Sequence, residues 1–231
     1  MAVRIFNIPI TPWRWLAILV SIVFHPLWWP SIGLYLLLLL NPFLFGVNEA
    51  AARSSLLLQV FALTFILPVF SIFLMRKLAL VNSYQLTERL DRVGPFIVTM
   101  IFYLWLYLSI RHDAAVPLVY NIFILGALIT LGLVFVSNLF FKISVHASVM
   151  GGLVAMTLLT FNIFSHETFT VDLPGEGLAS VSWYSALVWV ILLAGLVGTC
   201  RIYLQAHTLR EIYLGYLAGF ISQWIAFKIL F

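Results

Sequence analysis

A short polar segment between two long apolar stretches carries the side chains best suited to chemistry. It contains Arg201, His207, Arg210 and Glu211. His207 and Glu211 are four residues apart, so on one helix they share a face, where a carboxylate can fix the imidazole tautomer. Ionisable groups beside membrane-spanning sequence are costly unless they pair or bind a ligand. An oriented histidine beside a fixed guanidinium has the groups that phosphoryl transfer to histidine requires.

A second polar cluster lies in residues 142–148, where Lys142, Ser144 and His146 alternate just before a predicted helix. A lysine charge, a hydroxyl donor and the amides of a helix N-terminus can together bind a phosphate group. The structural alternative is that Ser144 caps the first turn of the helix and that His146 lies at the membrane interface.

The third cluster is the most charged stretch of the chain, residues 76–94. Its charged residues are Arg76, Lys77, Glu88, Arg89, Asp91 and Arg92. Such a stretch is typical of a positively charged loop at the membrane edge, and it can also supply arginines to a phosphate site. Pro95 can occupy the first turn of the next helix and so hold these arginines at the membrane surface.

The composition predicts an all-α, polytopic transmembrane helical bundle. The 231-residue chain is 64% hydrophobic and only 9% charged, with a mean hydropathy of +1.12, whereas soluble domains carry about 25% charged residues. The single cysteine, Cys200, excludes an intramolecular disulfide framework. A net charge of +4 argues against a nucleic-acid partner and fits local pockets for anions.

Seven apolar segments are long enough to cross a bilayer: residues 13–40, 54–75, 95–110, 116–141, 146–165, 182–201 and 209–230. Pro26 and Pro30 interrupt the first, which predicts a kink or a re-entrant half-helix there, so the bundle has six or seven spanning helices. We expect His25 to fill a backbone hydrogen bond freed at this kink. Residues 166–181 are expected to form a loop, and the whole chain, 1–231, a single membrane domain.

Counting crossings places the three polar clusters on one side of the membrane. Two spans separate the 76–94 cluster from residues 142–146, and two more separate these from residues 201–211. His112 and Asp113 fall in a hairpin on the opposite side, and we interpret them as solvated loop residues.

The clusters resemble the signatures of the type 2 phosphatidic acid phosphatase superfamily across residues 85–220. Residues 200–211 are similar to its third signature, Ser-Arg-x5-His-x3-Asp, with Cys200 at the serine position and Glu211 at the aspartate position. Residues 143–146 keep Ser144 and His146 of its second signature, Pro-Ser-Gly-His, with Ile143 and Val145 replacing proline and glycine. The first signature, Lys-x6-Arg-Pro, is matched loosely, since Gln85 takes the lysine position and Val93-Gly94 separate Arg92 from Pro95.

The resemblance implies a helical bundle with an active site at the membrane–water edge and no metal or cofactor. It implies that His207 attacks phosphorus, that Glu211 orients it and that His146 protonates the leaving alkoxide. The groups that stabilise the phosphoryl oxygens would be Arg201, Lys142, Ser144 and either Arg89 or Arg92. The substrate would be a lipid phosphate, either a phospholipid or a polyprenyl (pyro)phosphate, and we expect the protein in a bacterial inner (cytoplasmic) membrane.

Three alternatives stay open. The altered second signature, the missing lysine and Glu211 all fit a catalytically degenerate protein of the same fold that binds or transports lipid. His146, His207 and Glu211 are also acceptable zinc ligands, as in a metal-dependent membrane hydrolase. Finally, Thr208-Leu-Arg-Glu211 matches a capping box, in which Glu211 would bond a backbone amide instead of His207.

Overall fold

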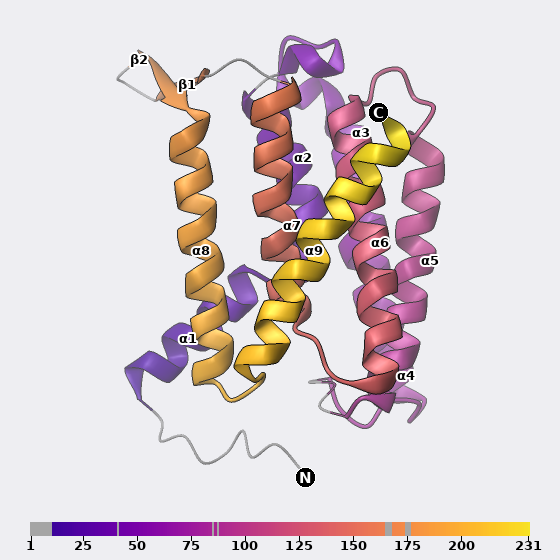
Figure 1. Ribbon diagram of the computed structural model, residues 1–231. Coiled ribbons are helices and arrows are strands. Elements are labelled where there is room, and N and C mark those ends of the chain that lie inside the picture. The colour runs from indigo at the N-terminus through magenta and orange to yellow at the C-terminus, as the bar shows by residue number, and fades with distance from the viewer. Residues whose placement is uncertain (1–10, 41, 85, 87, 165–167, 174–176) are drawn as a thin grey trace.

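The computed structural model describes residues 11–40, 42–84, 86, 88–164, 168–173 and 177–231. It is a bundle of helices, seven of which are long and apolar enough to cross a membrane in the part of the chain described. Figure 1 shows these helices running between two ends of the bundle. The all-α polytopic fold predicted from the composition is therefore confirmed, and the chain is an integral membrane protein.

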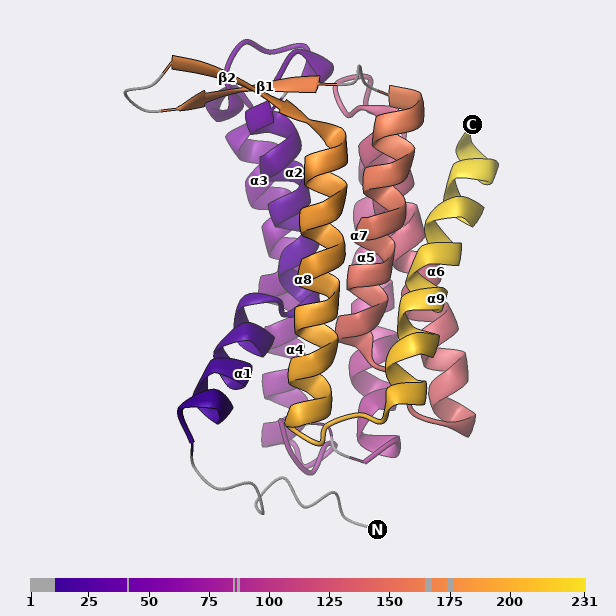
Figure 2. The same ribbon diagram turned by 60° about the vertical axis from the view of Figure 1, so that its left-hand side comes forward.

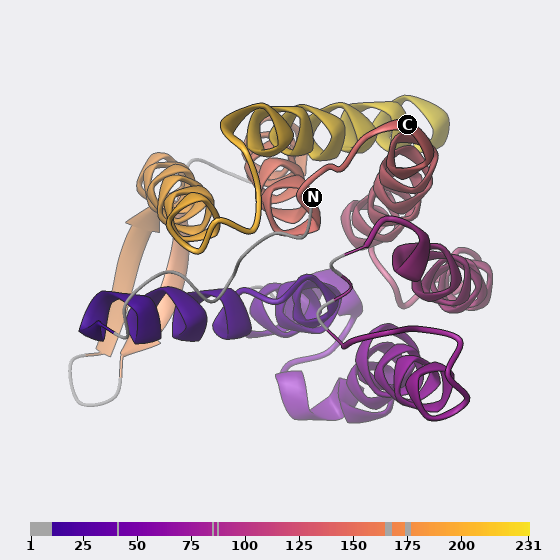
Figure 3. The same cartoon turned by 90° about the horizontal axis from the view of Figure 1, so that it is seen from below.

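The first spanning segment is broken into two short helices. Helix α1 (Pro12–Val23) ends before His25, a 3-10 turn, η1 (Pro26–Trp28), follows, and α2 (Trp29–Leu40) continues inward. Pro26 has no backbone N–H, so the α-helical hydrogen-bond ladder cannot continue through it. As a result α1 lies obliquely across the lower end of the bundle, as seen in Figure 1 and from below in Figure 3.

The predicted role of His25 at this break is confirmed. Its Nδ1 atom accepts a hydrogen bond from the Leu27 backbone N–H, at 3.4 Å, and so caps the 3-10 turn. The Trp28 indole stacks on the Phe65 ring, with centroids 4.0 Å apart. The break is thus held by specific contacts with the next span.

The remaining spans follow the predicted order. The second runs through η3 (Ala50–Arg53), α3 (Ser54–Phe61), the π-helical turn η4 (Ala62–Ile66) and α4 (Leu67–Lys77), after the short 3-10 turn η2 (Pro42–Phe45). The others are α5 (Val93–Ile110) with its leading turn η5 (Leu90–Arg92), α6 (Leu118–Phe140), α7 (Val145–Leu159) with the π turn η6 (Thr160–Phe164), α8 (Trp183–Tyr203) and α9 (Leu209–Leu230).

Residues 166–181, for which a loop was predicted, contain a pair of strands where the structure describes them. Strands β1 (Thr168–Leu173) and β2 (Gly177–Ser182) pair antiparallel, with Thr168 opposite Ser182. The sequence of β1, Thr-Phe-Thr-Val, is rich in the β-branched and aromatic residues that favour extended backbone, which outweighs its polar flanks. The hairpin projects from the end of the bundle opposite the three polar clusters (Figure 2).

The three polar clusters meet at one end of the bundle, as predicted. Helices α4, α6 and α8 end there, and η5, α7 and α9 begin there (Figure 1). The topology therefore brings the arginine loop, the Lys142–His146 segment and the turn between α8 and α9 to the same membrane edge.

Helices α7 and α9 pack closely because glycines line their contact. A Cβ atom on Gly219 would collide with the Ser148 carbonyl oxygen, and one on Gly151 would collide with the Tyr216 carbonyl oxygen. Small residues let membrane helices approach closely enough for backbone contact, which is how such helices associate in lipid. The Ser144 backbone N–H also donates to the Glu211 carbonyl, at 3.2 Å. The second and third clusters are thereby fixed relative to each other.

This packing predicts that Gly219→Ala destabilises the protein by about 1–3 kcal/mol, the usual cost of overpacking. Gly132→Ala is the matched control, because a Cβ atom there meets nothing within 4 Å. Alanine is also the better helix former, by up to about 1 kcal/mol, so this control should be neutral or stabilising. Thermal unfolding in detergent measures both, and equal midpoints for the two variants would contradict the packing described.

Candidate active site

The turn between α8 and α9 places His207 against the first turn of α9. The His207 Nδ1 atom lies 2.6 Å from Glu211 Oε2, and the His207 side chain is 4% exposed. Thr208 is the N-cap of α9, and its hydroxyl accepts from the Glu211 backbone N–H at 3.4 Å. The threonine half of the capping box therefore forms, while the Glu211 carboxylate bonds the imidazole.

The Glu211 carboxylate determines which nitrogen of His207 carries the proton. A carboxylate only accepts, so Nδ1 is the donor and the lone pair of the neutral imidazole lies on Nε2. Burial lowers the pKa of His207, and the positive charges of Arg201, Arg92 and Lys142 lower it further, to about 3. At neutral pH the side chain is an uncharged imidazole with a free nucleophilic nitrogen.

Two guanidinium groups line the same cavity as His207. Arg201, in the last turn of α8, donates from Nη1 to Ser21 Oγ at 3.3 Å, and its buried Nε has no partner among the described residues. Arg92, at the end of η5, donates from Nε to the Leu86 carbonyl at 2.8 Å. Neither forms a salt bridge within the described part of the chain. Half-buried cations without a direct ion pair favour binding of an anion.

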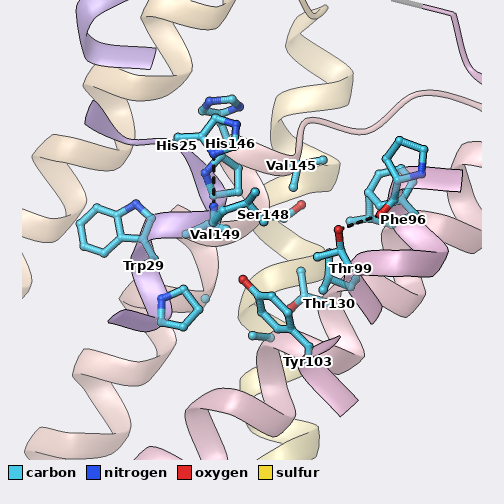
Figure 4. Close-up of a pocket in the computed structure, with 18 of the residues that line it drawn as sticks. His25, Trp29, Phe96, Thr99, Tyr103, Thr130, Val145, His146, Ser148 and Val149 are labelled. Carbon is cyan, nitrogen blue, oxygen red and sulfur yellow. Dashed lines mark hydrogen bonds between the residues drawn. The ribbon is translucent and has the colours of Figure 1, made fainter. Parts of the chain in front are cut away.

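His146 contacts the end of α1. Its Nε2 atom lies 3.1 Å from the Ser21 carbonyl oxygen, and its ring packs edge-on against the His25 ring, with centroids 5.7 Å apart. Figure 4 shows the two histidines together at one end of the cavity. The carbonyls in the last turn of a helix lack intrahelical partners, and the break before Pro26 leaves the Ser21 carbonyl free to bind this imidazole.

Ser21 and His25 were not predicted as site residues, although both lie in the site. Ser21 contacts Arg201 through its hydroxyl and His146 through its carbonyl, and His25 lines the cavity. The available signal was the position of Pro26, because a helix break frees backbone groups in the turn just before it.

Three predicted phosphate ligands have other contacts. Arg89 is exposed and donates to the Phe140 carbonyl at the end of α6, and the Ser144 hydroxyl is fully buried and accepts from the Ala147 N–H as the cap of α7. Lys142 is half-buried, and its charge reaches His207. None of them lines the cavity as far as the described residues define it, whereas Arg92, Arg201, His146 and His207 do.

The cavity is mostly apolar, with a volume of about 270 Å³. Its walls include Arg92 at the end of η5 and the adjoining face of α5, with Phe96, Thr99 and Tyr103. They also include one face of α6, with Val134, Leu131, Ala127 and Phe123. Along each helix these positions span eleven residues, or about 16 Å at 1.5 Å per residue. The charged residues lie at the membrane edge and the apolar wall extends inward, so the cavity fits an amphiphile with an anionic head.

The described residues do not support a metal centre. No group of three or more histidine, cysteine, aspartate or glutamate side chains lies close enough to hold an ion in the part of the chain described. The alternative in which His146, His207 and Glu211 bind zinc therefore has no geometric basis here.

The fold and the cavity define a polytopic integral membrane protein with a buried, positively charged site at one membrane edge. The chain matches no family model, no curated protein and no solved structure. Its function is therefore argued from the geometry of this site.

The lowered pKa of His207 predicts acid sensitivity. In the unfolded chain the imidazole has its ordinary pKa of 6.5, against about 3 in the folded protein. Between these values only the unfolded chain takes up the proton, so stability present above pH 6.5 is lost as the pH falls, by up to about 1.4 kcal/mol per pH unit for one group.

Thermal unfolding in detergent between about pH 7 and pH 5 measures this loss. His207→Gln should make the dependence on pH shallower by the share of one titrating group, because glutamine does not titrate. His112→Gln, at an exposed position just beyond the end of α5 that lies away from η5, should keep the slope of the unchanged protein. The same slope in all three proteins would contradict a buried, neutral His207.

Proposed function

We propose that the protein is a metal-independent lipid phosphate phosphatase that works through a phosphohistidine intermediate. The observation that carries the proposal is the 2.6 Å hydrogen bond between His207 and Glu211 at the charged end of a cavity that Arg92 and Arg201 also line. It orients a neutral imidazole whose free nitrogen can attack phosphorus, beside two guanidinium groups that can hold the phosphoryl oxygens.

In the first step His207 Nε2 attacks phosphorus, and the bond from phosphorus to the lipid oxygen breaks. Arg92 and Arg201 stabilise the equatorial oxygens, where charge accumulates in the transition state. Glu211 stabilises the positive charge that develops on the imidazole. His146 takes up a proton as the phosphate dianion enters beside it, and its ring nitrogen leaves the Ser21 carbonyl. It then gives this proton to the lipid alkoxide, which departs as an alcohol.

In the second step water attacks the phosphohistidine and displaces His207. His146, now neutral, accepts a proton from this water, and inorganic phosphate is released. The site returns to its starting state with one phosphate ester bond hydrolysed.

The shape of the cavity supports a lipid as the substrate. An apolar channel of about 16 Å buries a hydrocarbon chain, with a gain of about 0.8 kcal/mol for each methylene group removed from water. Small water-soluble esters would leave this surface empty. The similarity of the motifs to lipid phosphate phosphatases of membranes supports the same class, and we place the protein in a bacterial inner membrane on that similarity.

A second function, binding or transport of a lipid phosphate without hydrolysis, is favoured by three contacts. In this structure His146 bonds the Ser21 carbonyl, Arg89 bonds the Phe140 carbonyl and the Ser144 hydroxyl caps α7. A protein that only holds the phosphate needs the arginines and the channel, but it does not need a free acid at His146.

Phosphate release by the purified protein in detergent, with a chelator present, tests the proposal. The substrates are phosphatidate, phosphatidylglycerophosphate and undecaprenyl pyrophosphate. We expect His207→Ala to abolish release, because it removes the nucleophile. Glu211→Gln should lower release roughly 100-fold or more, because the imidazole loses its orienting carboxylate.

Two control variants change the same residue types outside the site. His112→Ala changes an exposed residue just beyond the end of α5 that lies away from η5, and Arg210→Ala changes an exposed cation in the first turn of α9. Both should release phosphate at the rate of the unchanged protein, whereas Arg201→Ala should not. Release that survives His207→Ala would disprove the mechanism, and folded protein that binds these lipids without hydrolysing them would establish the binding function instead.

A further inference from the structure

The inner part of the cavity carries two polar side chains deep within the apolar bundle. Tyr103 of α5 is 4% exposed and Gln223 of α9 is 1% exposed, and both line the cavity together with Phe123. A polar group in the membrane interior is costly unless its hydrogen bonds are satisfied, so such residues mark functional positions.

The amide group of Gln223 is only partly satisfied. Its Nε2 atom donates to the Phe123 carbonyl at 3.4 Å, a long hydrogen bond, and its buried Oε1 atom has no partner within the described part of the chain. The bundle makes space for this amide, because a Cβ atom on Gly126 would lie 2.5 Å from it. Its carbonyl oxygen remains an acceptor in need of a donor.

The hydroxyl group of Tyr103 is also without a partner. No hydrogen bond to it occurs among the residues described, and Figure 4 shows it directed into the cavity. The neighbouring hydroxyls differ: Thr99 donates to the Pro95 carbonyl at 2.7 Å, and Thr130 donates to the Gly126 carbonyl at 2.8 Å. Tyr103 is therefore a donor that faces the channel.

We propose that Tyr103 and Gln223 form a second binding subsite, which takes a hydroxyl group carried on the chain of the ligand. A hydroxyl can accept, as the Tyr103 phenol requires, and can donate, as the Gln223 oxygen requires, so the same kind of group suits both side chains. The subsite rests on the proposed function for the phosphate end of the ligand. The substrate class then narrows to lipid phosphates with a hydroxylated chain.

The position of the hydroxyl follows from the helix. Tyr103 is eleven residues from Arg92, about 16 Å along α5, and helical side chains lean back toward the N-terminus. The phenol oxygen therefore lies roughly 10 to 16 Å inward from the phosphate-binding arginine. A hydroxyl in the middle of an extended chain reaches it, and one beside the head group does not.

A plain hydrocarbon or isoprenoid chain would leave both polar groups buried and unpaired. One unsatisfied buried group costs about 1–3 kcal/mol, which is roughly a tenfold loss of affinity or more. In a purely apolar channel the plain chain would bind more tightly than the hydroxylated one, because the hydroxyl would lose its hydrogen bonds to water without replacing them. The sign of the preference therefore tests the subsite.

The probes are dodecylphosphonates, whose carbon–phosphorus bond cannot be hydrolysed. One has a plain chain, and the others carry a single hydroxyl near the head, in the middle or at the end of the chain. Calorimetry on the purified full-length protein in detergent gives each dissociation constant. We expect the mid-chain hydroxyl to bind roughly tenfold tighter than the plain chain.

Tyr103→Phe and Gln223→Met should each remove this preference while keeping the shape of the channel. Tyr107→Phe, one turn further along α5 and outside the cavity lining, should retain it. A plain chain that binds tightest to the unchanged protein would overturn the proposal. A mid-chain preference that survives both substitutions would also overturn it. The same holds if both variants bind every probe like the unchanged protein, because water alone would then fill the subsite.

Failure of the subsite and failure of the proposed phosphatase give different experimental results. Binding of phosphonates requires no hydrolysis, so a mid-chain preference in a protein that releases no phosphate supports the subsite and removes the catalytic function. Phosphate release without any preference for a hydroxyl keeps the catalytic function and removes the subsite. Absence of binding by every phosphonate would overturn both.

Discussion

The hydrogen bond between His207 and Glu211 is the interaction on which the rest of the site depends. It fixes the tautomer of a buried imidazole, and it exists because Thr208 begins α9 at the right residue. The Ser144 N–H bonds the Glu211 carbonyl, so this turn also fixes the start of α7 and hence His146. Glycine packing between α7 and α9 makes the approach close enough. One contact therefore links the proposed nucleophile His207, the carboxylate that orients it and the second histidine, His146.

The two arginines of the site favour binding of an anion that is not part of the chain. Arg92 and Arg201 share a cavity with no carboxylate paired to either within the described residues, and their fields keep His207 neutral. The break in the first span adds Ser21 and His25 to the same region. The bundle thus combines a fixed imidazole, cations that form no ion pair within the described residues and an apolar channel, which together match an anionic head and a hydrocarbon chain.

The features that could be predicted from the sequence are those that depend on hydropathy and on the spacing of neighbouring residues. Hydropathy defined seven spans because a long apolar run has few other uses, and the spacing of four residues between His207 and Glu211 placed them on one helical face. The sequence could not decide whether Glu211 would bond His207 or a backbone amide, since both are within reach. It could not separate Arg92 from Arg89 either, because only the fold shows that Arg89 bonds the end of α6. Ser21 enters the site through the tilt of α1, a tertiary property, and the hairpin was missed because its polar flanks resemble a loop.

An experimental structure of the protein with orthovanadate tests the central claim most directly. Vanadate adopts the five-coordinate geometry of phosphoryl transfer, so it reports the nucleophile without knowledge of the substrate. The account predicts vanadium bound to His207 Nε2 opposite the channel, with Glu211 still on Nδ1 and the equatorial oxygens on Arg92 and Arg201. Vanadate bound elsewhere, or a His207 imidazole that keeps Nε2 away from it, would contradict the account.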